Sequence, residues 1–192
     1  MRDVSDIAIR RATPADAPAI ARVRIDSWRT NYRGLIPDTY LDAMQVDAST
    51  AIWERVLTAE PNPTSVFVAT LRDDVVGFAA GNPLAEPKYG ANAELSAVYL
   101  RHEFQRAGIG RRLVAAVVED QRQRGATAMI VWLIAGNKAA RSFYENLGAE
   151  LVVEQPFQWD GLDLIEAGYV WRDLGALVAA CATAVPFPSI LQ

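Results

Sequence analysis

The chain has 192 residues, a length that favours a single domain. Hydrophobic residues make up 51% of the chain and charged residues 22%, so it can bury a core and is not globally disordered. The formal net charge of −4 argues against duplex nucleic acid as the main partner, because phosphate binding needs a basic surface.

Cys181 and His102 are the only cysteine and histidine in the chain. A lone cysteine excludes an internal disulfide, which favours a reducing compartment, and the two residues cannot form a Cys/His metal cluster. Residues 1–6 lack the apolar stretch of a signal peptide, and prolines at 186 and 188 interrupt the apolar run at 174–191. We therefore expect a cytoplasmic protein with no bound metal and no membrane partner.

The first half of the chain predicts strands and helices in a definite order. A strand at 7–10 precedes Thr13-Pro14-Ala15-Asp16, in which Thr13 can cap a helix, Pro14 suits its first position and Asp16 completes a capping box. That helix is expected to run to about residue 28. Further helices are expected at 38–44 and 49–60, a strand hairpin at 66–70 and 75–80, a loop at 82–92, and a strand at 94–100.

The second half predicts a helix, a buried strand, another helix and a final hairpin. Their expected ranges are 108–124, 129–135, 137–147, and 150–158 with 162–172. Gly148 suits a left-handed helix cap, and Trp159-Asp160-Gly161 is a hairpin signal. The order predicts a mixed α/β (α+β) fold, in which helices flank a central sheet of about seven strands. We expect one domain at 1–173 and an apolar extension at 174–192.

The segment between the strand at 94–100 and the next helix has the composition of an anion-binding turn. Gly108 and Gly110 let a ligand approach the backbone, and unpaired N–H groups at a helix start favour phosphate. Arg106, Arg111 and Arg112 add local positive charge. The segment lacks the Gly-Lys-Ser/Thr of a P-loop and the third glycine of a dinucleotide fingerprint. A glycine pair at a helix start is by itself more often a structural turn.

Two motifs taken together are more specific than the glycine pair alone. The sequence Gln105-Arg106-Ala107-Gly108-Ile109-Gly110, and downstream the segment from Asn137 to Ala149 with Phe143-Tyr144 inside it, resemble motifs of the GCN5-related N-acetyltransferase (GNAT) superfamily. The resemblance covers about residues 7–172. It implies the acyl-CoA N-acyltransferase fold and an acetyl-CoA-dependent enzyme. Such an enzyme moves acetyl to a primary amine of a small molecule or peptide, by direct attack in a ternary complex.

The resemblance also implies roles for individual residues. Backbone groups of the central strand would pair with the pantetheine arm, and the following loop would wrap the pyrophosphate. Asn137 would contact acetyl-CoA near its reactive end, and Tyr144 would lie beside the thioester sulfur. A helix cap for Asn137 and a core aromatic for Tyr144 stay open as alternatives. The implied cofactor-binding residues are Val98, Tyr99, Leu100, Gln105, Arg106, Ala107, Gly108, Ile109, Gly110, Arg111 and Asn137.

The chemistry requires a base, because an alkyl amine is mostly protonated at neutral pH. Glu94 is the candidate, at the start of the central strand where the family often carries a glutamate; an edge charge, or a water chain as the proton acceptor, stays open. The glutamate that some N-terminal-amine acetyltransferases carry five residues before the asparagine is replaced here by Trp132. We expect the acceptor pocket to be lined by aromatic residues, with Trp28, Tyr32, Tyr89 and Trp159 as candidates.

Two questions stay open on the sequence. The chain could be an acyl-CoA-binding module without catalysis, which would keep residues 105–111 but need neither Tyr144 nor Glu94. The apolar tail at 174–191 must pack on something. We favour a homodimer in which the tail crosses to a partner, and the alternative is a tail that closes over its own domain.

Overall fold

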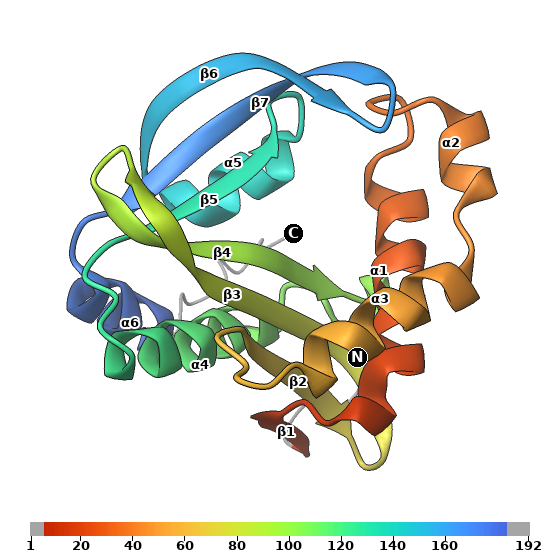
Figure 1. Cartoon of the computed structure of the whole chain (residues 1–192), viewed down its shortest axis with the longest axis horizontal. Coiled ribbons are helices and arrows are strands. Elements are labelled where there is room, and N and C mark those ends of the chain that lie inside the picture. The colour runs from red at the N-terminus through yellow and green to blue at the C-terminus, as the bar shows by residue number, and fades with distance from the viewer. Residues whose placement is uncertain (1–5, 184–192) are drawn as a thin grey trace, which may run out of the picture.

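The computed structural model describes residues 6–183 and contains one seven-stranded sheet in the order β1-β2-β3-β4-β5-β7-β6 (Figure 1). This confirms the predicted mixed sheet of seven strands. Every neighbouring pair is antiparallel except β4 and β5, which are parallel and joined by a helical crossover. The strands are β1 Ile7–Arg11, β2 Ser65–Leu71, β3 Asp74–Lys88, β4 Ala91–Leu100, β5 Met129–Ile134, β6 Glu150–Trp159 and β7 Leu162–Trp171.

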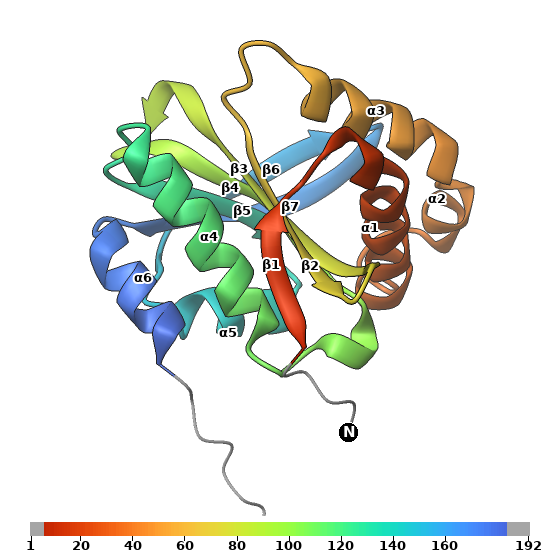
Figure 2. The same cartoon turned by 90° about the horizontal axis from the view of Figure 1, so that it is seen from below.

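Helices cover both faces of the sheet. Figure 2 shows α4, α5 and α6 on one side and α1, α2 and α3 on the other. The helices are α1 Ala17–Asn31, α2 Asp38–Ala43, α3 Val46–Thr58, α4 Ile109–Gln123, α5 Lys138–Glu145 and α6 Leu174–Ala182, with short 3-10 turns at Pro14–Asp16 and His102–Phe104. The apolar stripe of α4 packs on the sheet, and its four side chains are fully buried: Leu113, Val114, Val117 and Val118.

The predicted capping box forms in the 3-10 turn that leads directly into α1. The carboxylate of Asp16 accepts the backbone N–H of Thr13 at 2.7 Å and both guanidinium nitrogens of Arg10 at 2.8 Å. The Arg10 guanidinium holds the pKa of Asp16 at about 2, well below its usual range. This ion pair ties β1 to the helix that carries one wall of the site described below.

The prediction of a loop at 82–92 is wrong. Strand β3 continues to Lys88 and β4 begins at Ala91, so that only Tyr89 and Gly90, both in the left-handed region, form the turn. Prolines at 83 and 87 suggest a loop because they cannot donate to a sheet ladder. The ladder between β3 and β4 is interrupted between Pro83 and Lys88, so the missing donor of Pro87 falls in a gap in the pairing.

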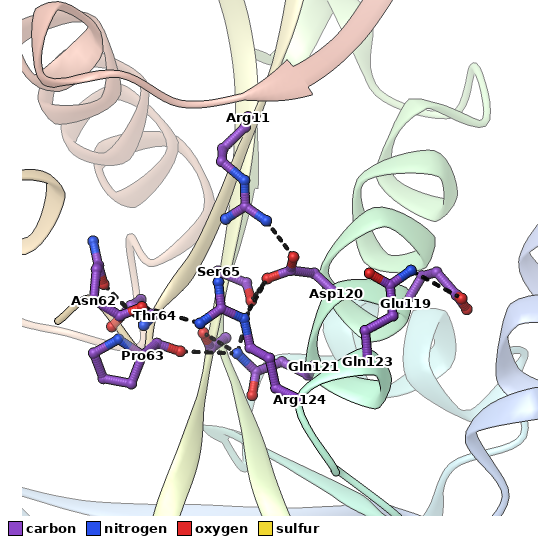
Figure 3. A network of polar contacts seen from close by, with 11 residues as sticks. Arg11, Asn62, Pro63, Thr64, Ser65, Glu119, Asp120, Gln121, Gln123 and Arg124 are labelled. Atoms are coloured by element: carbon purple, nitrogen blue, oxygen red, sulfur yellow. Dashed lines mark hydrogen bonds and ion pairs between the residues drawn. The ribbon is translucent and has the colours of Figure 1, made fainter.

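A buried polar network holds the C-terminal half of α4 against β2 and β3 (Figure 3). The fully buried Gln121 donates from Nε2 to Ser65 Oγ at 2.7 Å, to the Pro63 carbonyl at 3.1 Å and to the Gly81 carbonyl at 3.3 Å. Beside it, Asp120 accepts hydrogen bonds from Ser65, Arg11 and Arg124. Because a buried amide is costly unless bonded, this network fixes where α4 lies on the sheet.

The first part of the apolar extension packs on its own domain as α6. Leu174, Leu177 and Cys181 belong to the main core cluster, and Asp173 caps the helix by accepting the Ala176 N–H at 2.9 Å. Residues 184–192 lie outside the described residues, so the structure does not test a crossing to a partner subunit. No helix among residues 6–183 is long and apolar enough to cross a membrane.

Candidate active site

The parallel strands β4 and β5 separate soon after they meet. They pair only at Ala93 with Met129 and at Glu94 with Ile130, and Figure 1 shows them diverging beyond that point. On its other side β4 pairs with β3 through Leu100, and β5 pairs with β7 through Ile134. Each strand is therefore held firmly on one side, while its inner edge faces the gap between them.

A bulge in β4 changes which of its side chains point to each face of the sheet. Ala97 pairs with Ala80 and Leu95 with Gly81, so Ser96 is skipped. Leu95 and Val98 both join the cluster under α4, and Tyr99 packs on the opposite face with the residues under α1 and α3. The predicted pantetheine strand, Val98 to Leu100, thus lies along the diverging part of β4.

The loop after β4 has the shape expected of an anion-binding turn. Arg106 has φ 60° and Gly108 has φ 78°, both left-handed, and Gly108 is the N-cap of α4. Such turns gather N–H groups into concavities that bind anions. The loop is anchored at its start, where the Leu100 carbonyl accepts Ser27 Oγ at 3.0 Å and Gln105 Nε2 at 3.4 Å.

Gly110 also has a packing reason to be glycine. A Cβ atom there would lie 3.3 Å from the Leu100 side chain and 3.4 Å from the Phe143 ring, whereas a Cβ on Gly108 would meet nothing within 4 Å. Gly110 is small because α4 packs closely on the end of β4 and on α5. Gly108 supplies the left-handed backbone instead.

Two of the three arginines expected to add positive charge here are engaged elsewhere. Arg111 donates to the Ala180 carbonyl at 3.1 Å and the Thr183 carbonyl at 3.4 Å, at the end of α6. Arg112 donates to the Ile7 carbonyl at 2.8 Å. Of the three, Arg106 alone makes no ion pair or side-chain hydrogen bond with any residue in 6–183, and its side chain is exposed.

Tyr144, Tyr99, Tyr32 and Asn137 gather where β4 and β5 have separated. Burial raises the pKa of Tyr144 well above its ordinary value, and the nearby Tyr99 raises it further. Burial likewise raises the pKa of Tyr32, which also interacts with the other two tyrosines and with Asn137. Asn137 caps α5 by accepting the Ala140 N–H at 3.0 Å, as the helix-cap alternative predicts, and still reaches Tyr32. The site therefore holds protonated phenols at neutral pH.

Glu94 is half-buried at the last residue pair that joins β4 to β5. Burial raises the pKa of Glu94, and the negative charge of Glu166 raises it further while Lys88 lowers it. Glu166 on β7 is itself bound by Gln155 Nε2 at 2.8 Å. A carboxylate with a raised pKa is a better proton acceptor than an exposed one.

An aromatic cluster lies beside the tyrosines and joins α1, α2 and the β6–β7 turn. Trp28 stacks on Tyr32 with ring centroids 4.7 Å apart and meets Trp159 at 4.8 Å. Tyr40 meets Trp159 at 5.2 Å and donates its hydroxyl to Asp160 at 3.0 Å. Sequence reasoning missed Tyr40, because nothing in a short helix marks one aromatic residue as part of a site.

Tyr89, the fourth candidate for this wall, lies elsewhere. It sits at the β3–β4 turn, 6.0 Å from Trp132 between ring centroids, and is 45% exposed. The β3–β4 extension that replaced the expected loop carries it away from the aromatic cluster.

A cavity of about 320 Å³ opens between α1 and the loop after β4. It is lined by Asp26, Ser27, Thr30, Asn31, Leu100, Arg101, His102, Glu103 and Gln105. The cavity borders the loop at Leu100 and Gln105 but does not include Tyr144 or Glu94. Within residues 6–183 no three His, Cys, Asp or Glu side chains are grouped so that they could hold a metal ion.

Comparison with known proteins gives a consistent family. The family model described as "Acetyltransferase (GNAT) family" matches residues 25–149. The protein named "Uncharacterized N-acetyltransferase YuaI" of Bacillus subtilis (strain 168) is 37% identical over 172 residues, which are 89% of this chain and 96% of that protein.

More distant relatives carry names that state acceptors. "Spermidine N(1)-acetyltransferase" of Thermoplasma acidophilum is 21% identical over 164 residues, covering 79% of this chain and 98% of that protein. "L-methionine sulfoximine/L-methionine sulfone acetyltransferase" of Pseudomonas paraeruginosa is 28% identical over 162 residues, covering 78% and 83%. The crystal structure of the PaiA N-acetyltransferase of Thermoplasma acidophilum in complex with coenzyme A is similar in fold, with a TM-score of 0.68 at 21% identity and coverage of 84% and 97%.

Proposed function

Because the chain belongs to the acetyltransferase (GNAT) family, we propose that it moves the acetyl group of acetyl-CoA to a primary amine of a small molecule or peptide. The observation that carries this proposal is the divergence of β4 and β5 after Glu94 and Ile130. The gap between β4 and β5 has the left-handed turn before α4 at one end. The buried Tyr144 lies beside this gap.

In this proposal the gap receives the cofactor. The pantetheine arm lies along Val98 to Leu100 as an added strand would, and the amides from Arg106 to Arg111 bind the pyrophosphate. Support comes from the positive φ angles of Arg106 and Gly108 and from the unpaired first turn of α4. A fold neighbour solved in complex with coenzyme A is consistent with the same use of the fold.

The acetyl transfer then needs two proton movements. The neutral amine attacks the thioester carbonyl, a C–N bond forms, the C–S bond breaks, and the amine loses a proton to Glu94 directly or through water. The departing thiolate takes a proton from Tyr144. The raised pKa of Glu94 suits its role, because it makes the carboxylate a stronger base. The raised pKa of Tyr144 keeps its phenol protonated, so the hydroxyl is available as a hydrogen-bond donor to the thiolate as the C–S bond breaks.

The acceptor side is the aromatic cluster of Trp28, Tyr32, Tyr40 and Trp159. Two relatives named for their acceptors, spermidine in one case and methionine sulfoximine or sulfone in the other, support a small molecule carrying an amine. A homodimer and a cytoplasmic location also stay predictions of the sequence.

Titration calorimetry with coenzyme A, followed by acetyl-CoA turnover with a panel of amines, tests the proposal. We expect coenzyme A to bind and at least one amine to release free CoA thiol with formation of an N-acetyl product. Binding without turnover of any amine would favour the non-catalytic acyl-CoA-binding module. Absence of binding would remove the proposal.

A further inference from the structure

Arg24 is half-buried, and its guanidinium has no ion-pair or hydrogen-bond partner among the described residues. It lies on α1 one turn before Trp28, and its Cζ is 4.9 Å from the centre of a Trp28 ring. It forms no ion pair and no hydrogen bond with any residue between 6 and 183. The cation–π contact accounts for its position but leaves its five N–H donors free.

Other arginines around the site are engaged. Arg29, five residues later on the same helix, donates to the carbonyls of Leu41 and Met44 at 3.1 and 2.9 Å. Arg141 on α5 donates to the Ala135 carbonyl at 2.7 Å and pairs with Glu154. The nearest acid on the β6–β7 turn, Asp160, is already bound by the Tyr40 hydroxyl. Arg24 is therefore left with its charge directed at the aromatic cluster.

Trp28 provides the second observation. The side chain is only 8% exposed, and its indole Nε1–H is a buried donor without an acceptor of good hydrogen-bond geometry among the described residues. The Tyr99 hydroxyl is close enough to interact with both residues. Burial chiefly raises the pKa of Tyr99, and a poorly aligned hydrogen bond from Trp28 and the charge of Arg24 lower it. Trp28 and Arg24 therefore both act on Tyr99, so the guanidinium of Arg24 lies next to the tyrosines of the proposed site.

We propose that the acceptor amine carries a carboxylate, and that Arg24 binds it. The inference rests on the proposed function, since it names the substrate class of that site. A guanidinium is suited to a carboxylate because its planar fork matches the two oxygens. With the carboxylate held on α1, the amine of an amino acid points toward the gap where Tyr99 and Tyr144 lie.

A polycation is the competing acceptor, because the two carboxylates of Glu94 and Glu166 could hold one. They lie on β4 and β7, and Lys88 partly offsets them. Neither faces Arg24 closely enough to pair with it. A guanidinium without an ion pair or hydrogen bond among residues 6–183 favours an anionic group on the substrate.

The test compares acceptors that differ only in the carboxylate. Acetyl transfer is measured with L-phenylalanine and phenethylamine, and with spermidine as a polycation, for the wild type, Arg24→Gln and Arg22→Gln. Arg22 is an exposed residue of the same helix, so its variant is a charge-matched control. We expect Arg24→Gln to raise the KM for phenylalanine about tenfold or more, with the KM for acetyl-CoA and the rate with phenethylamine unchanged.

Binding gives a readout that is independent of turnover. Calorimetric titration of phenylalanine into the CoA-bound protein should show an affinity that falls about tenfold or more in Arg24→Gln and is unchanged in Arg22→Gln. An equal loss with phenylalanine and phenethylamine, preference for spermidine, or equal phenylalanine binding by wild type and variant would overturn the inference. A protein that binds phenylalanine through Arg24 but transfers no acetyl group would retain this site while removing the proposed enzyme activity.

Discussion

Glu94 and Tyr99 lie on the same face of β4, although they are five residues apart and strict alternation would place them on opposite faces. The skipped residue Ser96 causes this, because one extra residue in a strand reverses the faces beyond it. The bulge therefore brings the candidate base and Tyr99 to the same side of the sheet.

Replacement of Glu94 by glutamine should separate activity from stability. We expect turnover to fall and the rising limb of its pH profile to be lost, because glutamine accepts no proton. The folded pKa of Glu94 is raised, so its favourable contribution to folding is present at low pH and is lost as pH rises through that pKa. At pH 8 the variant should be at least as heat-stable as the wild type. Rate profiles and melting curves at several pH values measure both, and an unchanged rate profile would eliminate Glu94 as the base.

Tyr144→Phe should lower kcat about tenfold or more and leave the KM for acetyl-CoA nearly unchanged. The phenylalanine keeps the edge contacts with Phe143 and Trp171, at centroid distances of 5.2 and 5.7 Å, so packing survives. Tyr89→Phe, at the exposed turn, is the control. Steady-state kinetics decide the point, and full activity of the Tyr144→Phe variant would leave Tyr144 as a core aromatic only.

Gly108→Val should weaken coenzyme A binding about tenfold or more without unfolding the protein. A valine at φ 78° is strained, but no atom lies within 4 Å of its Cβ, so the strain stays in the loop. Gly125→Val at the other end of α4 is a matched control, with φ 98° and the same open space. Gly110→Val is less informative because it would collide with Leu100 and Phe143. Calorimetry should show an affinity loss only for the Gly108 variant; equal losses would indicate general destabilisation.

Arg111→Ala should loosen α6 and expose Cys181. Burial raises the pKa of the Cys181 thiol to about 11, so the thiol of the wild type should react slowly with a disulfide reagent at pH 8. Without the bonds from Arg111 to the end of α6, labelling should accelerate several-fold. Arg122→Ala, which removes an exposed pair with Glu119, is the control. Equal labelling rates in all three proteins would show that Arg111 does not hold the helix.

The favoured homodimer can be tested by cutting the chain after Thr183 instead of after Asp173. Removal of residues 174–183 would strip Leu174 and Leu177 from the core and confuse folding with assembly. Sedimentation of the full chain and of a chain ending at Thr183 should give a dimer and a monomer at micromolar concentration. Two monomers would end the dimer hypothesis.

The order of the elements could be predicted from the sequence because periodicity and caps are local signals. The capping box at Thr13 and Asp16, the apolar stripe of α4 and the left-handed Gly148 all formed as expected. Relations between distant segments could not be predicted. The pairing that continued β3 to Lys88, the bulge at Ser96 and the union of Tyr40 with Trp159 depend on which strands and helices meet. The free donors of Arg24 among residues 6–183 likewise become visible only when its neighbours are placed.

The early separation of β4 and β5 divides the sheet into two panels, β1 to β4 and β5 to β7, whose ladders meet at only two residue pairs. Backbone pairing joins the panels at Ala93 and Glu94. At the far end, side chains of the described residues bridge them, among them Trp28 with Trp159 and Tyr40 with Asp160. A ligand lying along Val98 to Leu100 would add its own hydrogen bonds between the two panels. Loading the cofactor would therefore stiffen the whole molecule, and the angle between the panels would set how closely the two substrates approach.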